Sequence, residues 1–487
     1  MNELLATALT AARDLGASYT DCRVERIESR RIEAEDGAAS TASYAESFGL
    51  AVRVIRDGAW GFAAVPAWTV DGAARAAREA VAVARASARL AGPAVRLAVE
   101  PSFPTGAAGV NEYRTPMKTD PFAIPIPELV TILKAWHELA MRTPGITNTS
   151  GHMDFRREEK WFSATDGPAR HQFIVQSGSG FSSGVHKSRR ESATRSYPSG
   201  PGQYATGGFE IVQSIPYERE IPRIAAQAVA LQAAPDAPSG PADLVLSGDL
   251  VSLQIHESIG HPLELDRVYG SERNFSGTSF ATPDKLGNLR YGSELVTVSA
   301  DATAPWGLGT FGFDDEGTAA KKYTLIEKGV LVGYLTSRET AARLGIAHSG
   351  GCMRAEGWQN LPLVRMTNIN LEPGSGSPAD LIAGIDEGLY IEGTASWSID
   401  DRRENFQLAG EIGWKIKGGR IREMVKGPRY RGNTVSFWNA CDGIAGREHY
   451  YIWGTPNCGK GQPGQNMRTG QGASHARFRQ IEVGEES

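Results

Sequence analysis

The segment His256-Glu257-Ser258-Ile259-Gly260-His261 constrains the fold of this chain more than any other. Two imidazoles with a carboxylate beside the first are the components of a zinc-hydrolase site, in which the imidazoles bind the metal and the carboxylate takes a proton from the metal-activated water. The common helical form is H-E-x-x-H, in which the two histidines are four positions apart. Here the step is five residues, so the backbone must bring both imidazoles to one side by other means.

The five-residue step predicts a distorted helix end. On a regular α-helix five residues advance about 500°, so the two rings would diverge by about 140° and could not share one ion. A π-bulge would lengthen one turn and bring such residues onto one face. Alternatively, Gly260 would end the helix as its carboxy-terminal cap, because Pro262 cannot continue it. At the other end, Asp249 is expected to cap a helix that starts at Leu250.

Two histidines need at least one more protein ligand, with one position left open for water. Cys458 lies in a Gly-rich loop that would let its sulfur approach the metal, and Lys460 nearby would favour the thiolate. A lone cysteine is more often a small buried apolar residue, however. The spacing leaves the third ligand open among five candidates, which are Glu264, His348, Cys352, His449 and Cys458.

The alternative to a metal site is that His256 and His261 are an unrelated buried residue and a capping residue. A single His-Glu pair, such as His137-Glu138, favours that interpretation. The complete motif, in a chain with only nine histidines, favours the metal site.

Composition excludes several other classes of protein. At 487 residues, with 41% hydrophobic and 22% charged residues, the chain is expected to form two or three globular domains. The net charge of −5 predicts neither a nucleic-acid partner nor a membrane partner, and basic doublets such as Arg402-Arg403 are expected to be solvated. The four cysteines lie far apart, which argues against a disulfide framework and favours a cytoplasmic location.

Hydrophobic periodicity predicts an α+β fold, with an α/β amino-terminal region followed by a β-rich, largely antiparallel carboxy-terminal catalytic domain. The expected domains are 1–238 and 239–487, and a Pro-containing stretch at 93–127 could divide the first into two subdomains. The expected elements are helices at 2–16, 71–90, 128–141, 218–233 and 250–260, short helices at 337–344 and 379–387, and strands within 21–34, 44–65 and 146–213.

Four motifs make the chain similar to the TldD/PmbA metalloproteases, and they occur in the same order. The resemblance covers essentially the whole chain and is most specific over 243–480. Because it carries H-E-x-x-x-H, the chain resembles the catalytic TldD-type subunits and not the TldE/PmbA-type partners that lack this motif. The four motifs are HESIGHPLELD at 256–266, FDDEGT at 313–318, RMTN at 365–368 and CGKGQ at 458–462.

The resemblance implies a set of site residues that spacing did not supply. It assigns His256, His261 and Cys458 as ligands of one Zn²⁺ per catalytic subunit and Glu257 as the catalytic glutamate. His348 and Cys352 fall outside the matching motifs, so the resemblance does not support them as the third ligand.

Five further acidic residues fall within the matching motifs. Glu264 and Asp266 match acidic positions that would orient an imidazole through its second ring nitrogen. The segment Asp314-Asp315-Glu316 is expected to be an acidic turn, and contact with substrate or a partner is its alternative.

These features predict a zinc-dependent peptidase that hydrolyses short or unfolded peptides, with Glu257 as the general base toward the attacking water. A β-rich groove suits an extended peptide. The resemblance implies a chamber enclosed by a dimer, formed with a TldE/PmbA-type subunit or with a second copy of the chain. The alternatives are a zinc amidase that acts on a modified small molecule and a non-catalytic assembly subunit stabilised by its metal.

Overall fold

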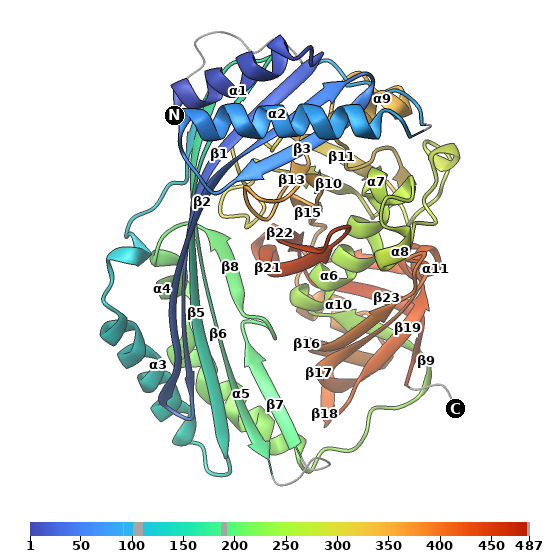
Figure 1. The fold of residues 1–487 in the computed structure, drawn as a ribbon. Coiled ribbons are helices and arrows are strands. Elements are labelled where there is room, and N and C mark those ends of the chain that lie inside the picture. The colour runs from blue at the N-terminus through green and yellow to red at the C-terminus, as the bar shows by residue number, and fades with distance from the viewer. Residues whose placement is uncertain (91, 101–110, 187–191, 485–487) are drawn as a thin grey trace.

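The computed structural model describes residues 1–90, 92–100, 111–186 and 192–484. Its strands form three main sheets, one built from β1 to β8 and two built from strands of the carboxy-terminal half. In Figure 1 the long strands of the first sheet stand beside the two smaller sheets. This arrangement confirms the predicted α+β fold, with a β-rich carboxy-terminal half. The division into domains at 238/239 stays our proposal.

The first sheet has eight strands in the order β3-β2-β1-β5-β6-β4, with β7 and β8 paired to β6. β1 and β2 extend beyond the predicted strands at 21–34 and 44–65 and meet at Asp36 and Gly37, whose φ angles of 48° and 77° suit a tight hairpin turn. The strands are β1 (Tyr19–Glu35), β2 (Ala38–Arg56), β3 (Ala59–Val65), β4 (Glu112–Arg114), β5 (Asn148–Ala164), β6 (Arg170–His186), β7 (Ser192–Tyr197) and β8 (Gln203–Thr206).

Helices cover this sheet at both ends (Figure 1). α1 (Asn2–Asp14) and α2 (Val70–Ser87) bury alanine and leucine side chains against β1, β2 and β3. α3 (Ile126–Met141), α4 (Glu210–Ser214) and α5 (Tyr217–Leu231) bury theirs against the other end. The expected linker at 93–127 contains β4 and the 3₁₀ turn Pro121–Ala123, and its residues 101–110 lie outside the described residues.

The carboxy-terminal half holds a seven-stranded sheet in the order β16-β9-β23-β19-β17-β18, with β20 on β23, and a six-stranded sheet in the order β12-β11-β10-β15-β22-β21. Most neighbours are antiparallel, as predicted, while β15–β22 and β16–β9 are parallel. The strands are β9 (Gly240–Leu246), β10 (Val298–Asp301), β11 (Lys322–Glu327), β12 (Val330–Leu331), β15 (Asn368–Leu371), β16 (Glu387–Ile399), β17 (Asn405–Lys417), β18 (Ile421–Val425), β19 (Arg429–Asn433), β20 (Cys441–Ile444), β21 (Tyr451–Lys460), β22 (Gln465–Ala473) and β23 (Ala476–Val483).

Short elements connect these strands. The expected helix at 379–387 ends early, because Gly384 follows its last residue. The short elements are α7 (Leu265–Val268), α8 (Arg273–Ser276), α9 (Arg338–Leu344), α10 (Pro378–Ala383), α11 (Thr434–Asn439), the two-stranded ribbon of β13 (Met353–Arg354) and β14 (Leu363–Val364), and 3₁₀ turns at Pro283–Lys285 and Arg447–His449.

One helix, α6 (Gly248–Ile255), runs through the main core and contacts strands of both carboxy-terminal sheets. Its Leu250, Val251 and Ile255 are completely buried in that core. The predicted cap is wrong, since the N-cap residue is Ser247 and the Asp249 carboxylate accepts a hydrogen bond from the Ser247 hydroxyl. Packing against two sheets therefore fixes where the end of α6 lies.

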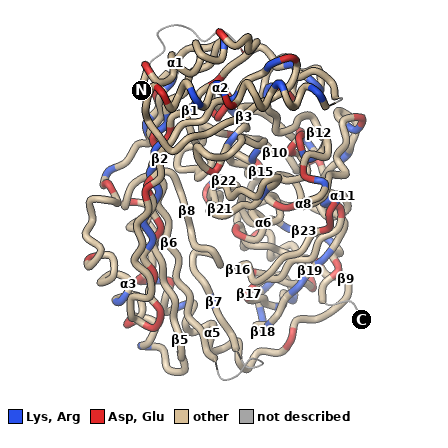
Figure 2. Tube along the Cα trace, in the orientation of Figure 1, with Lys and Arg blue, Asp and Glu red and all other residues tan. Residues whose placement is uncertain are grey.

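Charge is spread along the chain. Figure 2 shows Lys and Arg interspersed with Asp and Glu and not gathered in one long stretch. Within the described ranges, no helix has both the length and the apolar character needed to cross a bilayer.

Candidate metal centre

The chain leaves α6 through a π-helical turn. His256–Gly260 form this turn, and a 3₁₀ turn over His261–Leu263 follows. The structure confirms the π-bulge alternative, because the wider turn brings the two imidazoles together with ring centroids 4.9 Å apart. The capping alternative is wrong, since Gly260 keeps right-handed helical angles (φ −58°, ψ −63°).

Gly260 is required for a different reason, the close approach of Met366. A Cβ atom at position 260 would clash with the Sδ atom of Met366, whose side chain is completely buried against the turn. The absence of a side chain at position 260 therefore lets the π-helical turn pack closely against Met366, which precedes β15.

Cys458 completes a group of three buried donors. It lies on β21, an edge strand of the six-stranded sheet, and its Sγ is 3.4 Å from Nε2 of His261. The donor atoms of His256, His261 and Cys458 all lie within 4.8 Å of one another. Nδ1 of His256 is buried without a hydrogen-bond partner among the described residues. Two imidazoles, one thiolate and an orphaned nitrogen fit a zinc ion.

The protonation of this group is set by burial and by mutual charge. Burial would raise the pKa of Cys458, but His256, His261 and Arg365 outweigh it and hold that pKa well below its usual range. Burial would lower the pKa of His256, but the Cys458 thiolate outweighs it and raises the pKa to about 9. In His261 burial prevails and the pKa is well below its usual range. A bound metal would therefore displace a proton held between His256 and Cys458.

Lys460 had been expected to favour the Cys458 thiolate, but the cation that lowers the pKa of this thiol is Arg365. Arg365 is completely buried and donates hydrogen bonds to the carbonyl oxygens of Cys458 and Gln465. It holds the two strands of the β21–β22 hairpin together next to the Cys458 side chain. Its place in the RMTN motif was the available sequence signal, although that motif alone did not reveal this role.

Lys460 instead joins three carboxylates behind His261. Its Nζ lies 2.7 Å from Asp266 Oδ1, 3.3 Å from Glu264 Oε2 and 3.5 Å from Glu272 Oε1. Burial would lower the pKa of Lys460, but these carboxylates outweigh it and raise the pKa. Of the two acidic residues expected to orient an imidazole, only Glu264 contacts one, at 2.9 Å from Nδ1 of His261. Asp266 bonds Lys460 and the backbone of Arg267 and Val364.

Glu257 lies beside the donors and is also nearly buried. Its Oε2 accepts a hydrogen bond from Nη1 of Arg403 at 2.9 Å. Arg403 had been expected to be solvated, as half of a basic doublet, but its side chain is only 12% exposed. Hydrophobic periodicity could not reveal this contact, because the two residues are 146 positions apart in the sequence.

Comparison with known proteins places this site in a family. The model of the PmbA/TldA metallopeptidase C-terminal domain matches residues 239–485, and that of PmbA/TldA metallopeptidase domain 1 matches 20–84. The chain belongs to the PmbA/TldD metallopeptidase family. This finding confirms the resemblance drawn from the four motifs.

Relatives of this PmbA/TldD family member are metalloproteases by name. A metalloprotease from Methanothermobacter thermautotrophicus is 28% identical over 471 residues, which cover 96% of this chain and 95% of that protein. A zinc metalloprotease TldD homolog from Saccharolobus solfataricus is 29% identical over 249 residues, about half of each chain. TldE from Thermococcus kodakarensis has a TM-score of 0.72 at 16% identity and covers 99% of this chain and all of its own. That last likeness shows the shared fold alone.

The other third-ligand candidates of this family member lie elsewhere. Nδ1 of His348 bonds the carbonyl oxygen of Val99, and the Cys352 thiol bonds Tyr323. His449 lies in a 3₁₀ turn next to Glu448. The group of donors found among the described residues contains only His256, His261 and Cys458.

The acidic segment Asp314-Asp315-Glu316 is a turn, as expected, and its three side chains are buried. Asp315 pairs with Arg23 at 3.1 Å and with Lys160 at 2.7 Å, and Glu316 pairs with Arg53 at 3.3 Å. These cations lie on strands of the first sheet. The turn therefore joins the carboxy-terminal half to the amino-terminal region.

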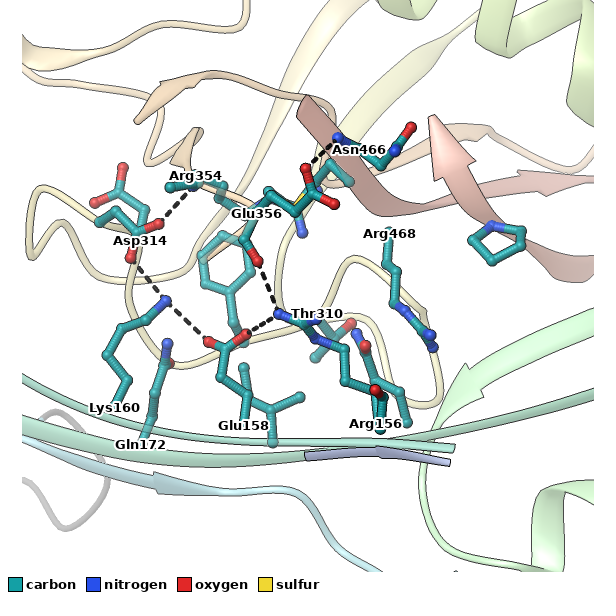
Figure 3. A pocket seen from close by; sticks show the side chains of 18 of the residues that line it. Arg156, Glu158, Lys160, Gln172, Thr310, Asp314, Arg354, Glu356, Asn466 and Arg468 are labelled. Carbon is teal, nitrogen blue, oxygen red and sulfur yellow. Dashed lines mark hydrogen bonds and ion pairs between the residues drawn. The ribbon is translucent and has the colours of Figure 1, made fainter. Parts of the chain in front are cut away.

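Beside this turn lies a polar cavity of about 300 Å³ between the first sheet and the β21–β22 hairpin (Figure 3). Lys160 and Glu158 point into it from β5, while Asn466 and Arg468 reach it from β22. The lining contains none of the three candidate metal donors. It does include Met467, the residue paired with Cys458 across the hairpin, so the cavity abuts the strand that carries the third donor.

Proposed function

We propose that this chain is a zinc-dependent peptidase of the catalytic TldD type that hydrolyses short or unfolded peptides. The observation that carries the proposal is the group of His256, His261 and Cys458, which the π-helical turn assembles beside Glu257. One zinc ion per chain would polarise the scissile carbonyl and acidify the attacking water.

Glu257 is the general base of the proposed reaction. Its carboxylate takes the proton of the attacking water and then passes it to the leaving amine. Two features of the chain support this role. The residue follows a metal donor directly, and its side chain is only 9% exposed, so its proton transfers are shielded from bulk water.

The position of Cys458 supports a peptide as the substrate. β21 is an edge strand, and an extended peptide can pair its backbone with such an edge without strict recognition of side chains. The side chain of Gln203 bonds Ile452 and Gly454 and so covers the start of that strand. Peptide addition would therefore fall on the part of β21 nearer to Cys458.

The proposed assembly is a dimer, either with a TldE/PmbA-type subunit or with a second copy. The likeness of the fold to that of TldE supports such a partnership, because partner subunits of one fold can pair through equivalent surfaces. The cytoplasmic location and the absence of nucleic-acid and membrane partners stay predictions.

Substitution of the general base tests the proposal. Glu257→Gln is expected to keep one zinc per chain and to abolish hydrolysis of an unstructured peptide library. Glu448→Gln is the control, since Glu448 is exposed in a 3₁₀ turn away from the donors. Zinc is measured by elemental mass spectrometry, and each protein is assayed alone and with a TldE-type chain. Turnover of small amides but of no peptide would reject the peptidase, and full activity of Glu257→Gln would reject the mechanism.

A further inference from the structure

The turn between β16 and β17 carries Arg403 to the metal centre. Asp400 fixes this turn, because its carboxylate accepts hydrogen bonds from the backbone N–H groups of Arg402, Glu404 and Asn405 at 2.9–3.0 Å. On the other side, the carbonyl oxygen of Arg403 accepts a hydrogen bond from the buried Thr434 hydroxyl at 2.8 Å. The turn is thus held in one conformation from both sides.

Arg403 adopts a backbone conformation that arginine rarely takes. Its φ is 63°, in the left-handed region that favours glycine. Such strained residues persist where the surroundings hold them, and they gather at functional sites. Here the strained backbone directs a long cationic side chain inward to Glu257, while the neighbouring Arg402 side chain stays 62% exposed.

The contacts of Arg403 differ from those of a structural arginine. Arg365 donates to the carbonyl oxygens of Cys458 and Gln465, and Arg267 donates to the carbonyl oxygen and the hydroxyl of Ser276. Within the described residues, the Arg403 guanidinium donates its one hydrogen bond to the Glu257 carboxylate and none to the backbone. Burial also lowers the pKa of Arg403. A buried cation with a single partner at the reacting carboxylate is costly for stability, which points to a role in function.

We propose that Arg403 is a positioning residue for the general base. By holding Oε2 of Glu257 at 2.9 Å it fixes the carboxylate plane and leaves Oε1 to take the proton of the attacking water. This inference rests on the proposed peptidase function. In this proposal the β16–β17 turn, which is far from His256–His261 in the sequence, sets the orientation of the Glu257 carboxylate.

A positioning role predicts a selective kinetic defect. Without Arg403 the carboxylate samples other rotamers, so the chemical step slows while peptide binding and zinc binding persist. A misplacement of about 1 Å at a reacting group lowers the rate on the order of 100-fold. The expected result for Arg403→Ala is therefore about a 100-fold lower kcat, with KM within about threefold of wild type and one zinc per chain.

The experiment compares Arg403→Ala and Arg403→Lys with Arg402→Ala as the matched neighbour. Arg403→Lys is expected to have a kcat between those of Arg403→Ala and wild type, because lysine restores the positive charge but not the planar set of guanidinium donors. Guanidinium ion at millimolar concentration should raise the kcat of Arg403→Ala in a saturable manner and leave Arg402→Ala and Glu257→Gln unchanged. A crystal structure of Arg403→Ala should show the Glu257 carboxylate displaced, which is a readout independent of turnover.

Unchanged kcat in Arg403→Ala, or loss of zinc together with kcat, would overturn the positioning role. If Arg403→Ala does not fold, Arg403→Lys decides, since an unaltered kcat in that variant equally overturns it. An inactive wild type removes both the proposed function and this inference. An active wild type whose Arg403 variants are also fully active removes this inference alone.

Discussion

Glu264 holds His261 in the orientation that a metal ligand needs. Its Oε2 lies 2.9 Å from Nδ1 of the ring, which leaves Nε2 facing Cys458 at 3.4 Å. Nζ of Lys460 lies 3.3 Å from the same carboxylate oxygen. A hydrogen on Nδ1 that points to this carboxylate would leave Nε2, the proposed ligand nitrogen, free of a proton before any metal binds.

Glu264→Gln tests this relationship. The amide keeps the size of the side chain but loses the charge, so His261 is oriented less firmly and Lys460 loses one partner. Zinc affinity is expected to fall about 10- to 100-fold. Competition with a chromophoric chelator measures it. Glu448→Gln, at an exposed position, is the control, and an affinity equal to wild type in Glu264→Gln would contradict the role.

Cys458→Ala tests the third ligand. Loss of the thiolate leaves two imidazoles, which bind zinc weakly, so the purified variant is expected to contain little zinc. Cys352→Ala is the matched control, because Cys352 is also completely buried but bonds Tyr323. That variant should keep its zinc and lose only some stability. Full zinc occupancy in Cys458→Ala, measured by elemental mass spectrometry, would reject Cys458 as a ligand.

Local sequence pattern predicted the elements better than their ends. The step between His256 and His261 predicted a distorted helix end and left two alternatives, a π-bulge and a cap at Gly260, of which the structure has the first. The cap was predicted at Asp249 but lies at Ser247, since packing between two sheets and not a local hydrogen bond fixes the start of α6. Propensity is a weak guide wherever tertiary packing decides.

Contacts between distant segments could not be predicted from pattern. The placement of Arg403 against Glu257 depends on the register of β16 and β17, which sequence alone does not give. In the same way, the burial of the acidic turn at Asp315 could not be predicted, because its partners, Arg23 and Lys160, lie on strands more than a hundred residues earlier. Cys458 entered the site through resemblance to the family and not through spacing.

Gly260→Ala tests the packing beneath the π-helical turn. The added methyl group would meet Sδ of Met366, and overpacking of this kind costs about 1–3 kcal/mol. We expect lower stability and weaker zinc binding, because the turn must shift. In Gly260→Ala/Met366→Ala the methyl group has room, so the loss should be smaller than the sum of the single losses. Additive losses, measured by denaturant unfolding and chelator competition, would show that the clash does not matter.

Glu25→Gln tests the ion-pair cluster around Lys160 through its pH dependence. Glu25 is completely buried, and its carboxylate oxygens have no hydrogen-bond partner among the described residues. Burial outweighs Lys160 and raises the pKa of Glu25 to about 7. A raised pKa gives stability that is complete below pH about 4.5 and is lost as the pH rises through about 7. Glu25→Gln, which cannot ionise, should thus match wild type at pH 5 and exceed it by about 2–3 kcal/mol at pH 8.

The matched control for this prediction is Glu28→Gln on the same strand, which should behave in the opposite way. Hydrogen bonds from Arg157 lower the pKa of Glu28, so its contribution is present above its usual pKa and is lost as the pH falls. Glu28→Gln is therefore expected to be less stable than wild type at pH 8 and to approach it in acid. Urea unfolding at both pH values measures all three proteins. A Glu25→Gln variant less stable than wild type at pH 8 would show that the ionised Glu25 stabilises the cluster, contrary to this account.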